Sequence, residues 1–441
     1  MEHTFAMISL GCAKNLVNSE QMLWLMSEAG FVLVPEPDGA DLAIVNTCGF
    51  IDAAKNEAID AILEMAELKA AGRLGHIIVT GCLAERYKDS IADEFPEVDA
   101  FIGVGSYGDI VEAAANCVEG EGFRAFAATS EAVDEIPRVV TTGPGWAYLR
   151  IAEGCNNFCA FCAIPYIRGR YRSRSMENII EEARDLAAHG IREIIVIAQD
   201  ITRYGTDIYK KRSLAELCRK ISEIEGVEWI RLHYLYPEAF DDELIDEIAS
   251  NDKIVKYLDI PVQHINSSIL KKMNRHTNGD EIRALFTKLR ERIPGLVIRT
   301  SLISGLPGEG EAEFEELCEF LREFKIERAG VFPFSPEEGT PAGLMEHVDY
   351  ETAQHRAELI MTEIQAPIMD AFCSSFIGRT VKVLCESRDE ESGLLCGRTY
   401  ADSPDIDGLV FFEGNCPEGE FAQVLINEAE DGFLYGEEVL S

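Results

Sequence analysis

The chain has 441 residues, enough for two or three domains, and its 40 basic and 78 acidic side chains give a formal net charge of −38 at pH 7. So acidic a surface repels nucleic acid and attracts basic proteins, and no apolar run is long enough to span a membrane. The N-terminus lacks the basic stretch and apolar core of a secretory signal. The 13 cysteines therefore indicate reduced thiols or metal ligands in a cytoplasmic protein.

Residues 1–140 alternate strand and helix patterns. Buried strands are predicted over residues 5–10, 42–46 and 77–80, and helices over residues 18–29 and 53–71. This alternation is typical of an open α/β domain with a parallel sheet.

A cysteine beside a glycine follows each of these three strands: Cys12, Cys48 and Cys82. Open parallel sheets bind ligands beyond the carboxyl ends of their strands, where neighbouring loops lie side by side. Cysteines that are distant in sequence can therefore converge there, and three thiolates can hold an iron–sulfur cluster. The alternative is three buried cysteines that only pack, because cysteine is among the most buried residue types.

A linker is predicted over residues 120–145, which include the turn sequence Thr-Thr-Gly-Pro-Gly. In the following segment, up to residue 376, six strands alternate with helices. This pattern predicts a partial or full parallel β/α barrel, closed by a long helix over residues 350–376. The strands are predicted over residues 147–152, 193–198, 229–234, 255–260, 296–303 and 329–334.

Residues 377–441 contain short β-rich runs separated by Gly, Pro, Asp and Asn, which predicts a small β-barrel. This segment has 4 basic and 15 acidic residues, a net charge of −11. Acidic residues group in two loops, at residues 389–391 and 402–407. We interpret them as a surface for a basic partner, with a merely solubilising surface as the alternative.

A second, compact triplet follows the first predicted barrel strand: Cys155, Cys159 and Cys162, with the spacing C-x3-C-x2-C. Such barrels carry their active sites on loops after the strands. Three thiolates on a cubic iron–sulfur cluster leave the fourth iron open to a substrate or cofactor, so the two triplets together predict two 4Fe–4S clusters. Structural zinc is the main alternative, but it needs a fourth ligand, and none follows Cys162 closely.

The compact triplet, with Phe161 before its third cysteine, resembles the motif of the radical S-adenosylmethionine enzymes. The resemblance implies that Cys155, Cys159 and Cys162 are catalytic and that S-adenosylmethionine binds the open iron. Electron transfer then cleaves this cofactor to a 5′-deoxyadenosyl radical, while the protein positions and shields it.

The whole chain resembles the methylthiotransferases of that superfamily. They have a three-cysteine domain, a radical barrel and a TRAM β-barrel, which here correspond to residues 1–140, 141–376 and 377–441. Residues 9–15 and 335–341 resemble the members that modify a small-subunit ribosomal protein; tRNA-modifying members tend to have Arg-Pro where Glu337 and Glu338 stand.

This resemblance implies methylthio transfer to the β-carbon of an aspartate in ribosomal protein twelve of the small subunit. One S-adenosylmethionine would methylate sulfur at the cluster of Cys12, Cys48 and Cys82, and a second would be cleaved at the other cluster. The expected partners are the basic ribosomal protein and an electron donor such as flavodoxin or ferredoxin.

Two other functions stay open from the residues alone. A tRNA adenosine methylthiotransferase would share the chemistry, but its terminal barrel should be basic rather than acidic. An iron–sulfur electron carrier or assembly scaffold would need no cofactor pocket and would not cleave S-adenosylmethionine.

Further candidate residues lie in or after the barrel strands. Strand-end placement favours a cofactor pocket, and ordinary structural hydrogen bonding is the alternative for each residue. The candidates are Gln199, Asp200, Gln263, Arg299 and Gly305. His264 is expected to be a hydrogen-bonded histidine rather than a base. The arginines at 168, 170, 172 and 174 either neutralise a cofactor, substrate or cluster, or are solvated or ion-paired.

Overall fold

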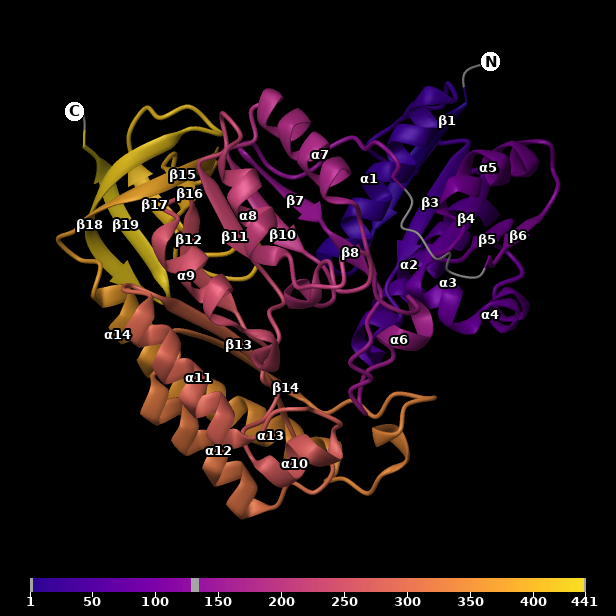
Figure 1. Cartoon of the computed structure of the whole chain (residues 1–441). Helices are drawn as coiled ribbons and strands as arrows, with labels where there is room; N and C mark the ends of the chain where they lie inside the picture. Colours follow the sequence, from indigo (N-terminus) through magenta and orange to yellow (C-terminus); the bar gives the residue numbers. More distant parts are fainter. Residues whose placement is uncertain (1–2, 128–134, 440–441) are drawn as a thin grey trace. The chain divides into compact units, whose positions relative to one another are not determined.

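The computed structural model describes residues 3–127 and 135–439 (Figure 1). The chain divides into two compact units. The first unit contains Met1–Thr141, Ala152–Arg174 and Glu337–Gly343, and the second contains Thr142–Ile151, Ser175–Pro336 and Leu344–Ser441. The loop of the second cysteine triplet therefore belongs to the first unit, although it follows a strand of the second. No helix in the described residues is long and apolar enough to cross a membrane.

A parallel six-stranded sheet forms the centre of the first unit, in the order β2-β1-β3-β4-β5-β6. Asn46 in β3 lies opposite Ser9 in β1 and Thr80 in β4, so the carboxyl ends of these three strands are level. The strands are β1 (Thr4–Ser9), β2 (Val32–Leu33), β3 (Leu42–Thr47), β4 (His76–Gly81), β5 (Ala100–Ile102) and β6 (Phe123–Ala125).

Helices cover both faces of this sheet. Ala43 and Val45 pack with α2, α3 and α4, whereas the alternate residues Leu42 and Ile44 pack with α1 and α5. Burial on both faces explains why the strands are continuous apolar runs. The helices are α1 (Ala13–Glu28), α2 (Asp52–Ala70), α3 (Cys82–Tyr87), α4 (Asp89–Glu94) and α5 (Ile110–Val118).

Two expectations for this unit were wrong. The first helix begins at Ala13 rather than at residue 18, because polar residues in its first turns, such as Lys14 and Asn15, are buried and break the apolar pattern. The predicted linker contains a strand, since β6 pairs with β5 at the sheet edge. Residues 128–134 of that linker lie outside the described residues.

The second unit has an open parallel sheet in the order β7-β10-β11-β12-β13-β14, so the barrel is partial. Its strands are β7 (Trp146–Arg150), β10 (Glu193–Ile197), β11 (Trp229–Leu232), β12 (Ile254–Asp259), β13 (Val297–Ser304) and β14 (Arg328–Pro333). Its helices up to β14 are α7 (Met176–Ala188), α8 (Leu214–Ser222), α9 (Asp242–Ser250), α10 (Ser267–Lys272), α11 (Gly279–Arg292) and α12 (Glu311–Phe324).

The single long helix predicted over residues 350–376 is interrupted. Helices α13 (Tyr350–Ile360) and α14 (Ala366–Ser374) flank a π-helical turn at Met361–Gln365. Pro367 explains the break, because it has no N–H to donate and its ring crowds the preceding turn. Gln365 in the π turn donates to the carbonyl of Ile326 at 3.1 Å, which fastens the helix beside β14.

The C-terminal segment forms a closed five-stranded barrel in the order β15-β16-β17-β19-β18, in which β17 and β19 are parallel. It packs on the sheet of the second unit, where the rings of Trp229 and Phe421 meet edge to face at 4.6 Å between centroids. The strands are β15 (Thr380–Arg388), β16 (Leu395–Arg398), β17 (Val410–Glu413), β18 (Phe421–Glu430) and β19 (Phe433–Glu438).

One of the two acidic loops of this barrel faces inward. Asp402 is buried and pairs with Arg328 of β14 at 2.5 Å, and Asp407 accepts a hydrogen bond from the Tyr257 hydroxyl at 2.6 Å. Their charges are satisfied inside the unit, so the expectation that both serve a basic partner was wrong. Of that loop's acidic residues, Asp405 is exposed.

Candidate active site

The first cysteine triplet lies at the carboxyl ends of three neighbouring strands, as predicted. Cys12 follows β1 and precedes α1, Cys48 follows β3 directly, and Cys82 follows β4 and begins α3. Because β1, β3 and β4 are adjacent in the sheet, the three loops share one edge.

Glycines allow these loops to approach closely. Gly11 has φ +90°, and a Cβ there would lie 2.7 Å from the Cβ of Cys48. Gly81 has φ +97°, and a Cβ there would lie 2.4 Å from the carbonyl oxygen of Thr47. Both positions therefore require glycine, for conformation as well as for space.

Buried amide hydrogen bonds fix the turn that carries Cys12. The Asn15 side chain donates to the carbonyl of Leu10 at 2.6 Å, and the Asn46 side chain donates to the carbonyl of Asn15 at 2.9 Å. Asn46 also donates to the Ser19 hydroxyl at 2.8 Å. The start of α1 is thus tied to the end of β3 by polar contacts.

The three thiols differ in acidity. Burial, with a further contribution from Cys82, raises the pKa of Cys48 to about 11, and burial also raises the pKa of Cys82 against the opposing charge of Arg168. Cys12 is the exposed member of the triplet. Partial desolvation opposes its ionisation, but Lys14, Arg168 and backbone N–H groups outweigh this effect and lower the pKa. Cys12 is therefore the most readily ionised of the three thiols. Because the thiolate is the form that binds metal, metal binding would release protons from Cys48 and Cys82.

The second triplet lies on a loop whose base is closed by a short hairpin. Strand β8 (Ala152–Glu153) pairs antiparallel with β9 (Arg172–Ser173), and the loop leads into α6 (Ile164–Ile167). The sulfur of Cys155 accepts from the backbone N–H of Asn157 at 3.5 Å. This hydrogen bond helps to hold the sulfur in its position on the loop.

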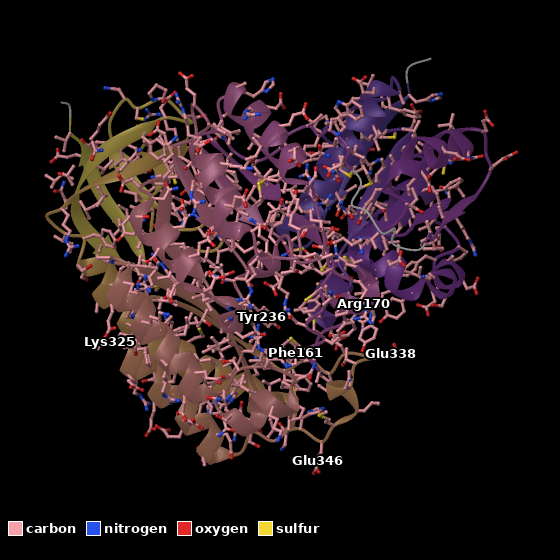
Figure 2. All side chains as sticks on the ribbon, viewed as in Figure 1. Phe161, Arg170, Tyr236, Lys325, Glu338 and Glu346 are labelled. Atoms are coloured by element: carbon pink, nitrogen blue, oxygen red, sulfur yellow. The ribbon has the colours of Figure 1, made fainter. Side chains whose placement is uncertain are left out.

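Cys155 and Cys159 of this loop are buried, whereas Cys162 and Phe161 are half-buried. The backbone N–H of Cys162 donates to the carbonyl of Cys159 at 3.0 Å. Figure 2 labels Phe161 on this loop.

The four arginines after the triplet have separate environments. Arg170, which is labelled in Figure 2, is exposed. Its guanidinium lies 4.5 Å from the ring centre of Phe158. Arg172 donates to backbone carbonyls, including that of Arg170 at 2.8 Å, and Arg174 pairs with Glu135 at 2.8 Å. Structural contacts thus account for Arg172 and Arg174. Arg168 differs from these three because it is buried within the first unit.

A short segment around Glu337 contacts the loops of both triplets. The buried Glu337 carboxylate pairs with Arg86 of α3 at 2.8 Å, and Arg86 also donates to the carbonyl of Gly49, next to Cys48, at 2.8 Å. Further along the segment, the N–H of Ala342 donates to the carbonyl of Ala160 at 2.9 Å. The segment therefore fastens the two loops within one unit.

The first two pocket candidates, Gln199 and Asp200, follow β10 as expected. Asp200 is buried and caps a 3₁₀ turn, where its carboxylate accepts from the N–H of Thr202 at 3.0 Å and from Arg203 at 3.1 Å. These contacts give Asp200 a structural role, and the cofactor role of both residues stays a prediction.

Gln263 and His264 follow β12. Gln263 has φ +71°, and its backbone joins β13 through a bond from its N–H to the carbonyl of Ser301 at 2.9 Å. His264 is buried; its Nδ1 accepts from two backbone N–H groups, and its Nε2 lies 3.2 Å from Glu309. Both ring nitrogens thus have hydrogen-bonding partners, so His264 is a hydrogen-bonded histidine, in agreement with the expectation.

The last two candidates belong to β13 and its end. Gly305 follows the strand with φ +77°, and a Cβ there would lie 2.5 Å from the Cβ of Ala353. Arg299 lies in the first half of β13 rather than at its carboxyl end, and it pairs with Asp259 at 2.7 Å. The contact with cofactor predicted for each stays a prediction.

Sequence reasoning missed Asn15, Glu153 and Glu337 as parts of the cysteine site. Two signals were available: a polar run at the start of α1, and a carboxylate two residues before Cys155. Neither pattern indicates which residues, distant in sequence, these polar side chains contact in the fold.

The donor sets suit iron–sulfur chemistry. In the described residues, no group of three or more His, Cys, Asp or Glu side chains is arranged to hold a metal ion. A cubic cluster binds each cysteine through a different iron, so the three sulfurs lie around the cluster and do not converge on one metal ion. Three cysteines on level strand ends, with glycines between them, fit this arrangement.

Family models match the chain in three parts. "Uncharacterized protein family UPF0004" matches residues 4–103, "Radical SAM superfamily" matches 149–321, and "TRAM domain" matches 377–439. The radical S-adenosylmethionine methyltransferase TsrM from Kitasatospora setae has a similar fold, with TM-score 0.59, 15% identity, and coverage of 78% of this chain and 75% of that one. Fold and matches define a radical S-adenosylmethionine protein with a three-cysteine domain and a TRAM barrel.

Curated relatives narrow this class. Proteins described as ribosomal protein uS12 methylthiotransferase RimO are 47% identical in Lachnoclostridium phytofermentans, covering 97% of this chain and 98% of the relative, and 46% identical in Acetivibrio thermocellus, covering 99% and 98%. The Clostridium perfringens protein of the same description is 44% identical, covering 99% and 98%. The chain belongs to the RimO family of radical S-adenosylmethionine methylthiotransferases.

Proposed function

We propose that this chain transfers a methylthio group to the β-carbon of an aspartate in small-subunit ribosomal protein uS12, in the cytoplasm. The main support is its full-length similarity to the RimO relatives named for that substrate. The placement of both cysteine triplets in one compact unit also supports it, because the reaction needs two sulfur-ligated centres.

The family implies iron–sulfur and S-adenosylmethionine chemistry. We assign one 4Fe–4S cluster to Cys12, Cys48 and Cys82, and a second to Cys155, Cys159 and Cys162. When bound, these groups and S-adenosylmethionine supply the methylated sulfur and the deoxyadenosyl radical, with electrons from a donor such as flavodoxin or ferredoxin.

The chain's own residues hold and shield these groups. Cys155 and Cys159 are buried, and the N–H of Asn157 holds the sulfur of Cys155 in position. We propose that the cofactor pocket is formed by Phe161, Gln199, Asp200, Gln263, Arg299 and Gly305. The proposed domains are residues 1–140, 141–376 and 377–441.

The test is anaerobic incubation of the reconstituted protein with S-adenosylmethionine and reductant. Ribosomal protein uS12 and tRNA are supplied in separate reactions, and both are analysed by mass spectrometry. A methylthio gain on uS12 alone is expected, whereas modification of tRNA alone would refute the substrate assignment.

Two variants divide the roles of the triplets. Cys12→Ala should still form 5′-deoxyadenosine but transfer no methylthio group, whereas Cys159→Ala should lose both activities. Loss of cleavage in Cys12→Ala, with the second cluster intact by iron content, would contradict separate roles.

A further inference from the structure

Arg168 follows the second triplet in sequence but reaches the first triplet in space. It is 2% exposed and lies directly after α6. Its guanidinium donates to the side-chain oxygens of Asn15 and Asn18 in α1, each at 3.2 Å, and pairs with Glu153 at 3.0 Å. Two of its three hydrogen-bonding partners therefore stand on the helix that begins beside Cys12.

The hydrogen-bonding partners of Arg168 compensate only part of its positive charge, so the remainder can interact with the thiols. An arginine stays protonated at all relevant pH values, so its burial requires nearby negative charge or oriented acceptors. Glu153 is the one carboxylate that pairs with it among the described residues, and this carboxylate also accepts from the N–H of Gly154 at 3.2 Å. The two asparagines contribute only neutral dipoles.

The sulfur atoms are the other electron-rich groups nearby. The Arg168 guanidinium hydrogen-bonds the sulfur of Cys82, and its charge also acts on the sulfur of Cys12. Ala163, directly before α6, and Ile167, the last residue of α6, pack on Cys82. The turn that carries Arg168 is thus seated against a ligand of the first triplet.

We infer that Arg168 is a positioning residue of the first triplet's site, where it supplies the buried positive charge that balances the thiolates of Cys12 and Cys82. The loop of the second triplet thereby contributes a positive charge to the first site. This inference rests on the proposed function, because it requires an iron–sulfur cluster on the first triplet. A positive charge beside an anionic cluster favours its reduced form, so loss of the charge lowers the reduction potential.

The experiment isolates the first cluster by changing Cys155, Cys159 and Cys162 to Ala, which should leave about four irons per chain. Its reduction is followed by anaerobic redox titration with electron paramagnetic resonance. Arg168→Met should shift the midpoint to lower potential. Arg168→Lys should keep the midpoint near that of the parent, because it retains the charge. Arg170→Met is the matched control and should leave the midpoint unchanged, because Arg170 is exposed.

A variant that should shift the midpoint potential in the opposite direction distinguishes an electrostatic effect from a merely structural one. Glu153→Gln removes the carboxylate that offsets Arg168 and should shift the midpoint upward. Equal midpoints for Arg168→Met and its parent, or equal shifts for the Met and Lys variants, would overturn the inference. A parent without iron at the first triplet would instead refute the proposed function.

Arg168→Met is also made in the chain that keeps all six cysteines. This second experiment is needed if the variant does not hold the first cluster, because no midpoint can then be measured. Loss of about half of the iron, with 5′-deoxyadenosine formation retained, would place Arg168 at the first site and support the inference. Loss of 5′-deoxyadenosine formation with the first cluster intact would overturn it.

Discussion

Glu193 joins the sheet of the second unit to the C-terminal barrel through two buried ion pairs. It is the first residue of β10 and is 0% exposed. Its carboxylate lies 2.6 Å from Arg231 of β11 and 2.6 Å from Arg398 of β16. We predict that Glu193→Gln strongly destabilises this unit, because it leaves two buried cations with less compensation.

The magnitude follows from what each arginine retains. Removing one partner of a buried ion pair costs about 3–5 kcal/mol. Arg398 keeps Glu386 at 2.7 Å, and Arg231 keeps the carbonyl of Tyr400 at 2.8 Å. We therefore expect the lower end, about 3 kcal/mol, rather than twice the value for one pair.

The assay is anaerobic urea unfolding with tryptophan fluorescence, because Trp146 and Trp229 both lie near this interface. Glu228→Gln is the matched control. Glu228 pairs with Lys382 of the same barrel, but both side chains are 37% exposed, so the loss should stay below about 1 kcal/mol. Equal losses for the two variants, or a loss below about 1 kcal/mol for Glu193→Gln, would refute the reasoning.

Three other predictions concern Glu193, Gly11 and the terminal barrel. Burial raises the pKa of Glu193, but Arg231 and Arg398 outweigh burial and lower this pKa in the folded state. The carboxylate therefore stabilises the fold above its unfolded pKa of about 4.3. The difference in urea midpoint between wild type and Glu193→Gln should become smaller as the pH falls below that value. Gly11→Ala should lose about half of the iron measured per chain, because its Cβ meets Cys48, whereas Gly30→Ala, with φ +88° and nothing within 4 Å, should keep all of it. Deletion of residues 377–441 should unfold or aggregate the second unit in size-exclusion chromatography and abolish 5′-deoxyadenosine formation; a monomeric truncation with full cleavage would contradict the role of the buried pairs.

The cysteine site could be predicted in part because its signals are local. A cysteine and a glycine after each buried strand suffice to place Cys12, Cys48 and Cys82 on one sheet edge, since parallel strands end together. The start of α1 could not be predicted, because its buried polar residues are satisfied by strand ends far away in sequence. The π turn had a local signal in Pro367, yet the apolar pattern continues through it.

The arginines show why charge patterns alone do not define a site. Arg168 and Arg170 are the same residue type two positions apart, and only the fold distinguishes the buried cation beside Cys82 from the exposed one over Phe158. Solvent weakens the field of Arg170 at any distant group, whereas the field of Arg168 acts in a medium of low polarizability. The sequence could nominate four arginines, but burial decides which one can act on a cluster.

The same reasoning limits what the acidity of the terminal barrel can recognise. Asp402 is paired with Arg328, and Asp407 accepts a hydrogen bond from Tyr257, so both carboxylates are engaged inside the unit and are not free to contact a partner. Glu390 and Glu391 in the other acidic loop are exposed and keep their charge available. We therefore expect any attraction to the proposed basic ribosomal protein to come from that loop and similar exposed positions. A net charge counted from the sequence overstates the attraction, because buried pairs cancel part of it before any partner arrives.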